Sequence, residues 1–512
     1  MLSPAVAQTS PSTNAGNSNG ASATGNGSAT ASSNEGPAQD SPYPGWASQA
    51  GPVAPIPFRK FSAGVSLSAN DFQGSVASAP ARPGILDLSL DDAIRRGLET
   101  NLAIRLRREQ QNISQGQRSL ALQSMLPIVT ASGSTSLSQV DLVTEGFRAS
   151  AFHGLLPPGV TIPQIVSPET TTGQGNLNWS AINISALRNY QAAKIQQSVA
   201  AATTADSQQT VVLNVAAAYL QAQAAASQLT NAQALLKADQ ALLNDVAEEH
   251  RAGVVANIDE LRARVQMQSQ QQAVIAAQNA QAKANIALER MIGLDPAQQI
   301  NLTETVPYAE LDNQASLSEL QRQAWATRAD YRAAQGQVRA AEMQRKAASA
   351  ERLPTLSFGG FYGIIGITYA SYRTDFFAGA NLNFPLFKEA SLRGDRAVAQ
   401  EQVTAGRAQA ENLAGQIDAE IRSAQIDYDA AKSLVSVARS NMQLAQLELD
   451  QAVDQFKAGV TENLAVVDAQ AGLAAAQTSL INSLLRYNVA KLEMAHALGV
   501  LDSQYSQYLR GK

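Results

Sequence analysis

The chain has 512 residues and a formal net charge of −5, from 38 Lys and Arg against 43 Asp and Glu. This mild acidity gives no electrostatic reason to expect nucleic-acid binding, and the absence of cysteine excludes disulfide scaffolds, thiol catalysis and Cys-ligated metal sites. With only three scattered histidines, neither a metal nor a cofactor is expected.

Residues 1–85 are rich in Ser, Asn, Gly, Ala, Thr and Pro. Such a segment buries too little apolar surface to offset its loss of conformational entropy, so the composition predicts a disordered N-terminal segment. Residues 3–8 resemble the small-residue cleavage end of a secretory signal, which favours export. The basic and apolar regions that should precede such an end are missing, and a chance likeness in an Ala- and Ser-rich segment is the alternative. No run of roughly 20 uncharged apolar residues indicates a spanning helix, whereas a β-barrel would leave a weaker trace.

The rest of the chain is an internal duplication. Arg-Ala-Gly-Val at 251–254 recurs as Lys-Ala-Gly-Val at 457–460, and Leu-Pro at 126–127 recurs at 353–354. Similar pairs continue through both halves, and the change in spacing places about 21 extra residues in one loop of the first copy. The predicted organisation is a first repeat at 86–300, a linker at 301–312, a second repeat at 313–501 and a short, mobile polar tail at 502–512.

Each repeat begins with a predicted helix, at 90–124 and 317–351, which a Leu-Pro pair ends. A β-hairpin follows, at about 127–182 and about 354–386. Very long helices come next, broken only near Gly253 and Gly459, where glycine supplies a cap and a turn. Apolar residues spaced by seven along these helices are typical of coiled coils, and a soluble rod would show the same pattern.

The predicted hairpins alternate apolar residues with small uncharged ones. In the first strand Val129 and Leu137 share a face, and serines and a threonine occupy the other. A soluble sandwich would show the same alternation. The uncharged polar face, strand lengths near the 9–11 residues that cross a bilayer at a tilt, and the absence of strands for a second sheet favour lipid outside and water inside.

Four strands per chain cannot close a barrel, and an open sheet edge in lipid leaves unpaired backbone groups that cost several kcal/mol each. A membrane-spanning form must therefore be oligomeric. Two copies would give eight strands, a width that side chains fill, and three would give twelve, the smallest plausible barrel with an open bore. The long antiparallel helices would continue as a tube on one side.

The Leu-Pro pairs, Asn-Phe-Pro-Leu-Phe at 383–387 before a helix, the two Ala-Gly turns and the duplication make residues 86–501 resemble the TolC family of outer-membrane efflux proteins. The resemblance implies an α+β membrane protein: a homotrimer with a twelve-stranded outer-membrane barrel and an α-helical tunnel in the periplasm. It also implies a passive duct of a tripartite efflux or type I secretion system, which docks a periplasmic adaptor and an inner-membrane pump. No nucleotide-binding Gly-x-x-x-x-Gly-Lys motif occurs, so a partner must supply energy.

The resemblance places the two Ala-Gly turns at the periplasmic tip, where adaptor hairpins dock. The residues expected there are Gly253 and Gly459 with Arg251, Lys457 and Phe456. Glycine permits a tight turn and a close approach of a partner backbone. The alternative for each glycine is a helix cap that has no partner.

The resemblance also implies a constriction near the tip. Asp468 stands where several relatives have an acid that lines the bore, and three such carboxylates would attract cations. The second acid of that double ring is an alanine here, and a solvated surface aspartate is the alternative. Asp259 matches an acid that ties the closed tip to an arginine, whose position is a threonine in this chain. We therefore expect apolar packing of Leu464 and Val467 to hold a closed state.

Trp179, Tyr362 and Phe384 are expected at the membrane interface, with packing between strands as the alternative. The competing function is a soluble or surface-attached coiled-coil structural protein. Two uncharged alternating hairpins at equivalent positions argue against it, because a rod has no use for them. No paired carboxylates, nucleophile elbow or metal-ligand spacing indicates an enzyme.

Overall fold

The computed structural model describes residues 68–76, 80–81, 83–146, 157, 163–304, 308–310 and 316–510. The chain divides into two compact units. The described part of the first unit, within residues 139–167, holds one small antiparallel pair, β3 (Val140–Asp141) with β4 (Ile165–Val166). All other described elements belong to the second unit. Residues 1–67, predicted to be disordered, lie outside the described residues.

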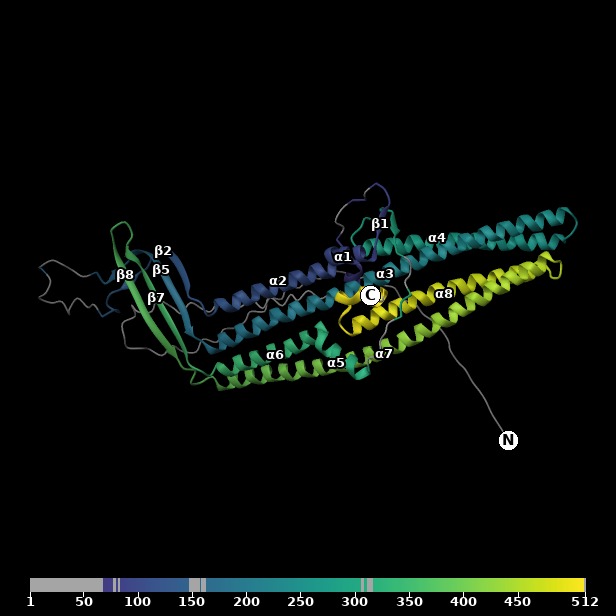
Figure 1. Ribbon diagram of the computed structural model, residues 1–512. Helices are drawn as coiled ribbons and strands as arrows, with labels where there is room; N and C mark the ends of the chain where they lie inside the picture. Colours follow the sequence, from purple (N-terminus) through teal and green to yellow (C-terminus); the bar gives the residue numbers. More distant parts are fainter. Residues whose placement is uncertain are drawn as a thin grey trace, which may run out of the picture. The chain divides into compact units, whose positions relative to one another are not determined.

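The second unit repeats one pattern of helices and strands (Figure 1). A helix pair, two strands and two long helices occur in the first half and again in the second, which confirms the order of elements predicted from the duplication. Its helices are η1 (Ala69–Gln73), α1 (Leu90–Thr100), α2 (Leu102–Gln123), α3 (Ile184–Arg251), α4 (Asn257–Met291), α5 (Leu317–Thr327), α6 (Ala329–Ala350), α7 (Glu389–Lys457), α8 (Asn463–Ala497) and α9 (Leu501–Arg510).

The two predicted hairpins form one antiparallel sheet of four strands in the order β2-β5-β7-β8. Their central pairing, β5 with β7, joins the two repeats. A separate parallel pair joins the start of the first repeat to its end. The strands are β2 (Ile128–Leu137), β5 (Glu169–Ile182), β7 (Thr355–Ile367) and β8 (Ser371–Asn383), with β1 (Leu86–Leu88) beside β6 (Ile300–Leu302).

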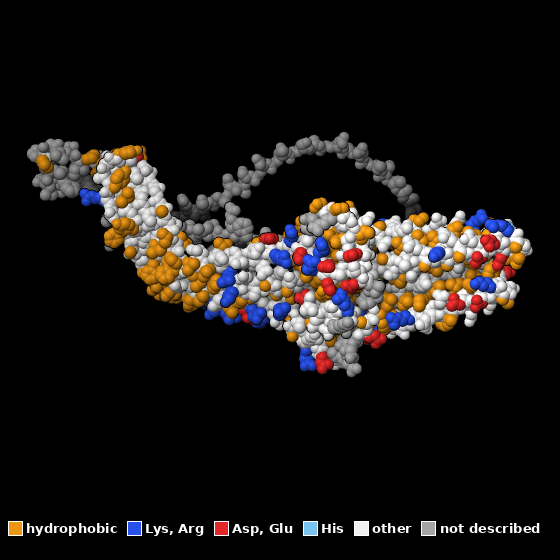
Figure 2. Space-filling model, turned by 45° about the horizontal axis from the view of Figure 1, so that its top comes forward, with side chains coloured by type: hydrophobic (Ala, Val, Ile, Leu, Met, Phe, Trp, Pro, Cys, Tyr) orange, Lys and Arg blue, Asp and Glu red, His pale blue; other side chains and the backbone are white. Residues whose placement is uncertain are grey.

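The register of the four-stranded sheet separates its faces as the alternation predicts. Val129 lies opposite Leu177, and Trp179 lies opposite Phe358 on the same face. The other face carries hydroxyl and amide groups, and Ser134 and Thr172 hydrogen-bond across it at 2.8 Å. Figure 2 shows hydrophobic side chains gathered in a band over the strands. The sheet therefore presents an apolar face, uncovered in one protomer, and a largely polar one.

The long helices pair as antiparallel arms. α3 has 68 residues and α7 has 69, which at ~1.5 Å per residue is about 100 Å each. α3 turns into α4 at Gly253 and α7 turns into α8 at Gly459, with φ of 75° and 69°. These left-handed conformations favour glycine. Both breaks confirm the sequence-based prediction.

The largest apolar core lies where the short elements meet the long helices. It includes Tyr219, Leu288 and Leu492, all with at most 1% of their surface exposed. The hydroxyl of Tyr219 donates a hydrogen bond to the carbonyl oxygen of Leu88 at 3.1 Å. This contact fixes β1 to the middle of α3.

The predicted first helix of each repeat is not continuous. It breaks at Asn101 between α1 and α2, and at Arg328 between α5 and α6. The Asn101 side chain accepts a hydrogen bond from the amide of Ala103 and donates one to the carbonyl of Phe72, both at 2.9 Å. A capping side chain and tertiary contacts therefore end these helices, without the proline or glycine that a sequence pattern would reveal.

Two predicted unstructured segments are partly ordered. The polar tail expected at 502–512 is helix α9 up to Arg510, and Leu509 is fully buried. The guanidinium of Arg510 pairs with Glu304 at 2.7 Å. Disorder predicted for 1–85 is wrong for 68–76, where Phe72 packs against the main core. Tertiary contacts, which composition does not report, order both segments.

Among the described helices, α8 is long and apolar enough to cross a membrane by length and composition alone. One such helix is weak evidence of a helical span, since core helices can pass the same test. α8 packs along α7 and also contacts α3, so its apolar side chains serve the helical arms.

Candidate functional site

The two tip turns have the same geometry. The amide of Val254 donates to the carbonyl of Glu249 at 2.9 Å, and the amide of Val460 donates to Gln455 at 3.0 Å. Each bond reaches back five residues, as in the Schellman motif, in which a glycine ends a helix. Both valine side chains are more than 70% exposed. The fold thus presents an apolar side chain at each tip.

The predicted tip residues divide into two groups. Gly253 and Gly459 lie in the turns, and Arg251 and Lys457 beside them are exposed. Phe456 instead is half-buried against an apolar cluster that includes Val466. It supports the turn from inside, so its ring is less available to a partner than the sequence alone indicated.

Polar contacts join the two helical arms at their tips. The side-chain amide of Asn463, fully buried at the start of α8, donates to the main-chain carbonyl of Asp259 at 3.3 Å. Arg262 on α4 lies 3.6 Å from the carboxylate of Glu462 and 3.4 Å from that of Asp259. The link between the repeats is therefore made by a buried amide and an exposed ion pair.

Leu464 and Val467, whose apolar packing is expected to hold a closed state, are only partly covered within one protomer. The Leu464 side chain is 43% exposed, Val467 is half-buried, and the buried residue of that turn is Val466 at 1%. The helical period turns Val466 toward α7 and leaves Leu464 outside. Sequence reasoning missed the role of Asn463, whose signals were the matching Asn257 of the first repeat and its place directly before an apolar run.

A further side-chain contact closes the first tip. His250 Nδ1, near the end of α3, lies 2.8 Å from Glu260 Oε2 on α4, and Arg264 binds the same carboxylate at 2.7 Å. The Arg264–Glu260 pair lies within α4, whereas the His250–Glu260 contact reaches across the turn that contains Gly253. Together they stiffen the turn, because the ends of both helices are held by side chains as well as by the backbone.

The tips are strongly acidic. Residues 245–264 and 448–468 together hold ten Asp and Glu against four Lys and Arg. Figure 2 shows acidic side chains gathered near this end of the long helices. Asp468 is exposed on α8, one turn beyond the exposed Leu464. Such a surface attracts cations and basic partner surfaces and repels anions.

Trp179 and Tyr362 lie on the apolar face of the sheet, whereas Phe361 and Phe377 stack on each other on the opposite face. Trp179 stacks on Phe358 with ring centroids 5.9 Å apart, and its Nε1 donates to the carbonyl of Met125 at 3.0 Å. It is nevertheless 39% exposed, so strand packing and outward exposure coexist. Tyr362 is 70% exposed and Phe384, just beyond β8, is 54% exposed. Trp179, Tyr362 and Phe384 can all meet lipid.

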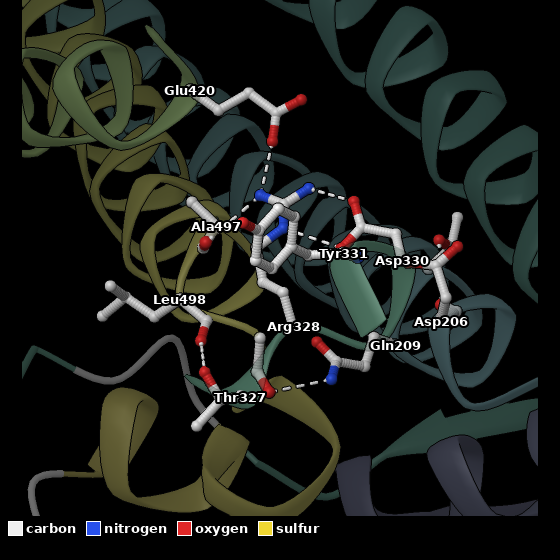
Figure 3. Close-up of polar contacts among 11 residues, drawn as sticks. Asp206, Gln209, Thr327, Arg328, Asp330, Tyr331, Glu420, Ala497 and Leu498 are labelled. Carbon is white, nitrogen blue, oxygen red and sulfur yellow. Dashed lines mark hydrogen bonds and ion pairs between the residues drawn. The ribbon is translucent and has the colours of Figure 1, made fainter. Parts of the chain in front are cut away.

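A buried arginine joins the helices midway along the arms (Figure 3). Arg328, 6% exposed, donates to the carboxylates of Asp330 at 2.7 Å and Glu420 at 2.6 Å. It also donates to the carbonyl of Ala497 at 3.2 Å. Nearby, the Gln209 amide donates to the carbonyl of Gly499 at 2.9 Å. The cluster therefore ties α3, α6 and α7 to the end of α8.

Asp206 of α3 faces this cluster. Burial, together with the charge of Asp330, raises the pKa of Asp206 to about 6, although the Arg328 charge opposes that rise. Burial alone would raise the pKa of Asp330 too, but hydrogen bonds and charge from Arg328 lower it. The Arg328 guanidinium thus keeps the Asp330 carboxyl ionised, whereas the Asp206 carboxyl remains easy to protonate. Within the described residues, no group of three His, Asp or Glu side chains is placed to hold a metal.

Residues 93–294 and 320–500 match the outer membrane efflux protein family. The chain belongs to this family. Its location is the outer membrane, and the family is one of efflux channels, not enzymes. The soluble coiled-coil alternative is therefore rejected.

Two relatives come from Pseudomonas putida. The chain is 26% identical over 324 residues to the pyoverdine export outer membrane protein OpmQ, which covers 62% of this chain and 66% of that protein. It is 28% identical over 339 residues to the toluene efflux pump outer membrane protein TtgF, covering 61% of this chain and 66% of that protein. The chain therefore spans slightly under two thirds of these relatives.

Solved outer-membrane channels share the fold. The CmeC channel of Campylobacter jejuni matches with a TM-score of 0.69 at 15% identity, covering 80% of this chain and 86% of that one. The open state of MtrE from Neisseria gonorrhoeae matches with a TM-score of 0.66 at 17% identity, covering 85% and 94%. These similarities confirm the predicted fold class, long tunnel-type helices with transmembrane strands.

Proposed function

We propose that the protein is a passive outer-membrane efflux channel that assembles as a homotrimer. The observation that carries this proposal is one continuous four-stranded sheet with an apolar face, a largely polar face and two unpaired edges, β2 and β8. Unpaired backbone groups are too costly in lipid for the sheet to remain open. Pairing β8 of one copy with β2 of the next would close twelve strands from three copies.

The helical arms would then surround a tunnel that continues from the barrel. β5 and β8 lead directly into α3 and α7, so each protomer contributes both arms at the same end of the barrel. The polar face, with its Ser, Thr and Asn side chains, would line the water-filled bore. Solutes would cross without chemical change, and the lack of a nucleotide-binding motif leaves energy to a partner.

The tips are the proposed contact with a periplasmic adaptor and, through it, an inner-membrane transporter of a tripartite efflux or type I secretion system. Exposed Val254 and Val460 would provide apolar contact at the turns, and Arg251 and Lys457 would flank them. Because the glycine turns leave the backbone at these residues little conformational freedom, docking of a partner would cost little conformational entropy.

The same tips would form the gate. Asn463 and the Arg262–Glu462 pair hold the arms together, so separating them is part of opening. Asp468 would contribute one carboxylate per protomer to the bore and favour cations. The Leu464 side chain, exposed within one protomer, is available to pack against a neighbouring copy in the closed state.

Detergent extraction followed by size measurement tests the assembly, and reconstitution in a planar bilayer tests the channel. We expect the protein in the membrane fraction, a detergent-stable trimer and discrete ion conductance. A chain that stays in aqueous solution without detergent, or a trimer without conductance in any state of the tips, would contradict the proposal.

A further inference from the structure

Basic side chains concentrate where the sheet meets the helices. The end of α6 and the start of α7 carry six Lys and Arg against three acids, although the whole chain carries more acids than bases. The six are Arg345, Lys346, Arg352, Lys388, Arg393 and Arg396. The first repeat adds Arg118, Arg188 and Lys194, and residues 110–127 and 183–205 contain no acid. We call these nine residues the basic collar.

Much of the collar charge has no carboxylate partner within the described part of the chain. Three of its arginines hydrogen-bond neutral glutamine side chains instead: Arg118 to Gln197 at 3.2 Å, Arg188 to Gln191 at 2.9 Å and Arg345 to Gln400 at 3.0 Å. A glutamine orients a guanidinium without neutralising it. The side chains are therefore held in place while their positive charge stays available.

The exception is Glu389 at the start of α7. It lies 2.6 Å from both Arg352 and Arg393, and the hydrogen bond from Arg393, together with the charges of both arginines, lowers the pKa of Glu389. One carboxylate shared by two arginines still leaves a positive charge. Three further members of the collar, Lys346, Lys388 and Arg396, are exposed.

Exposed apolar residues adjoin the collar. Leu386 is 87% exposed and Phe387 is fully exposed, directly before Lys388. Figure 2 shows Lys and Arg side chains beside the hydrophobic band of the sheet, on the same face. An apolar band bordered by cations matches the profile of a bilayer, where acyl chains give way to phosphates.

We propose that the basic collar binds the headgroups of anionic phospholipids in the membrane leaflet at the helical end of the sheet. Phe387 and Leu386 lie in the acyl region near that boundary, and the lysine and arginine ends reach the phosphates above it. Guanidinium groups pair well with phosphate oxygens. This inference rests on the sheet crossing the membrane.

The position of the collar favours lipid over a soluble partner. Its members come from the four helix ends that adjoin the sheet, α2, α3, α6 and α7, and both repeats contribute. In an oligomer, such a collar would follow the boundary of the bilayer around the whole assembly. The collar also adjoins the apolar band directly, because Phe387 and Lys388 are consecutive residues. The acidic tips, at the other end of the arms, would be repelled by the same headgroups.

Lipid binding to the purified trimer in non-ionic detergent, measured by native mass spectrometry, tests the proposal. We expect phosphatidylglycerol to bind more tightly than phosphatidylcholine of the same acyl chains. The R345Q/K388Q/R396Q variant should lose about fivefold in phosphatidylglycerol affinity per side chain. The matched control is K237Q/K283Q/R332Q, which removes three exposed charges away from the collar and should keep the preference.

The wild-type protein provides a second measurement that needs no variant. Because salt at 1 M shortens the screening length to about 3 Å, it should abolish the preference for phosphatidylglycerol. Equal affinity for the two lipids in low salt, or an unchanged preference in the collar variant, would overturn the proposal. Displacement of the lipid by millimolar inorganic phosphate would also overturn it, by identifying a free anion as the ligand. Conductance in neutral lipid, measured in parallel, shows whether the channel itself works.

Discussion

Arg262 of the first repeat and Glu462 of the second lie 3.6 Å apart at the tips of the helical arms. Both side chains are accessible, at 36% and 79% exposure, so solvent screens their attraction. Beside them, the Asn463 amide is fully buried and bonds the carbonyl of Asp259. The buried contact and the exposed one should therefore differ in strength.

Replacing Asn463 should open the tip more than breaking the ion pair. Glu462→Gln removes an exposed pair worth about 0.2–1 kcal/mol, whereas Asn463→Ala removes a buried hydrogen bond worth about 0.5–1.5 kcal/mol and leaves a carbonyl without that donor. We expect a larger rise in single-channel conductance or open probability for Asn463→Ala. The reverse ranking would show that the ion pair dominates the link.

Asp468→Ala should reduce the preference of the channel for cations. The exposed carboxylate, repeated around the bore of a trimer, raises the local cation concentration. The reversal potential in a salt gradient measures the effect, which should shrink in high salt. Asp502→Ala removes an equal charge from α9 and serves as the control. Equal reversal potentials for wild type and Asp468→Ala would place this carboxylate away from the conduction path.

Asp206 predicts a pH dependence of stability. Its folded-state pKa of about 6 lies above the ordinary value of 3.8, so the folded state gains stability as pH falls through 6 toward 4 and loses it as pH rises through that window. Asp206→Asn should be more stable than wild type by about 1–3 kcal/mol at pH 7. Denaturant unfolding of the detergent-solubilised protein should show this difference shrinking at pH 5. A constant difference would exclude titration of Asp206 as its source.

The structural features that could be predicted from the sequence are those that repeat or alternate along the chain. The duplication, the glycine turns and the strand faces follow from spacing and period, which a single chain displays directly. Contacts between distant segments left no such trace. Asn463 reaches Asp259 across 204 positions, and Arg328 ends a helix through partners on α7 and α8, so neither function could be predicted from local pattern.

Comparison of the two repeats could have revealed more. Asp239 and Glu289 stand at buried positions in the first repeat, where the spacing of 206 places Ala445 and Ala495 in the second. Burial raises the pKa of Asp239 to about 6 and that of Glu289 to about 7. An acidic residue in one repeat at the position where the other repeat has a buried alanine indicates an unusual environment. Only a comparison of the two repeats gives this signal.

Among these substitutions, replacing Arg328 should cause the largest loss of stability. Arg328→Ala would leave the carboxylates of Asp330 and Glu420 without their shared guanidinium and beside Asp206, and breaking a buried ion pair from one side costs about 3–5 kcal/mol. We expect a corresponding loss in the free energy of unfolding and weaker trimers in detergent. Arg332→Ala, at an exposed position in the first turn of α6, should change little. Adding Asp330→Asn to Arg328→Ala should recover part of the stability, because it removes one of the uncompensated charges. If the double variant is no more stable than the single one, the loss comes from packing of the arginine side chain and not from its charge.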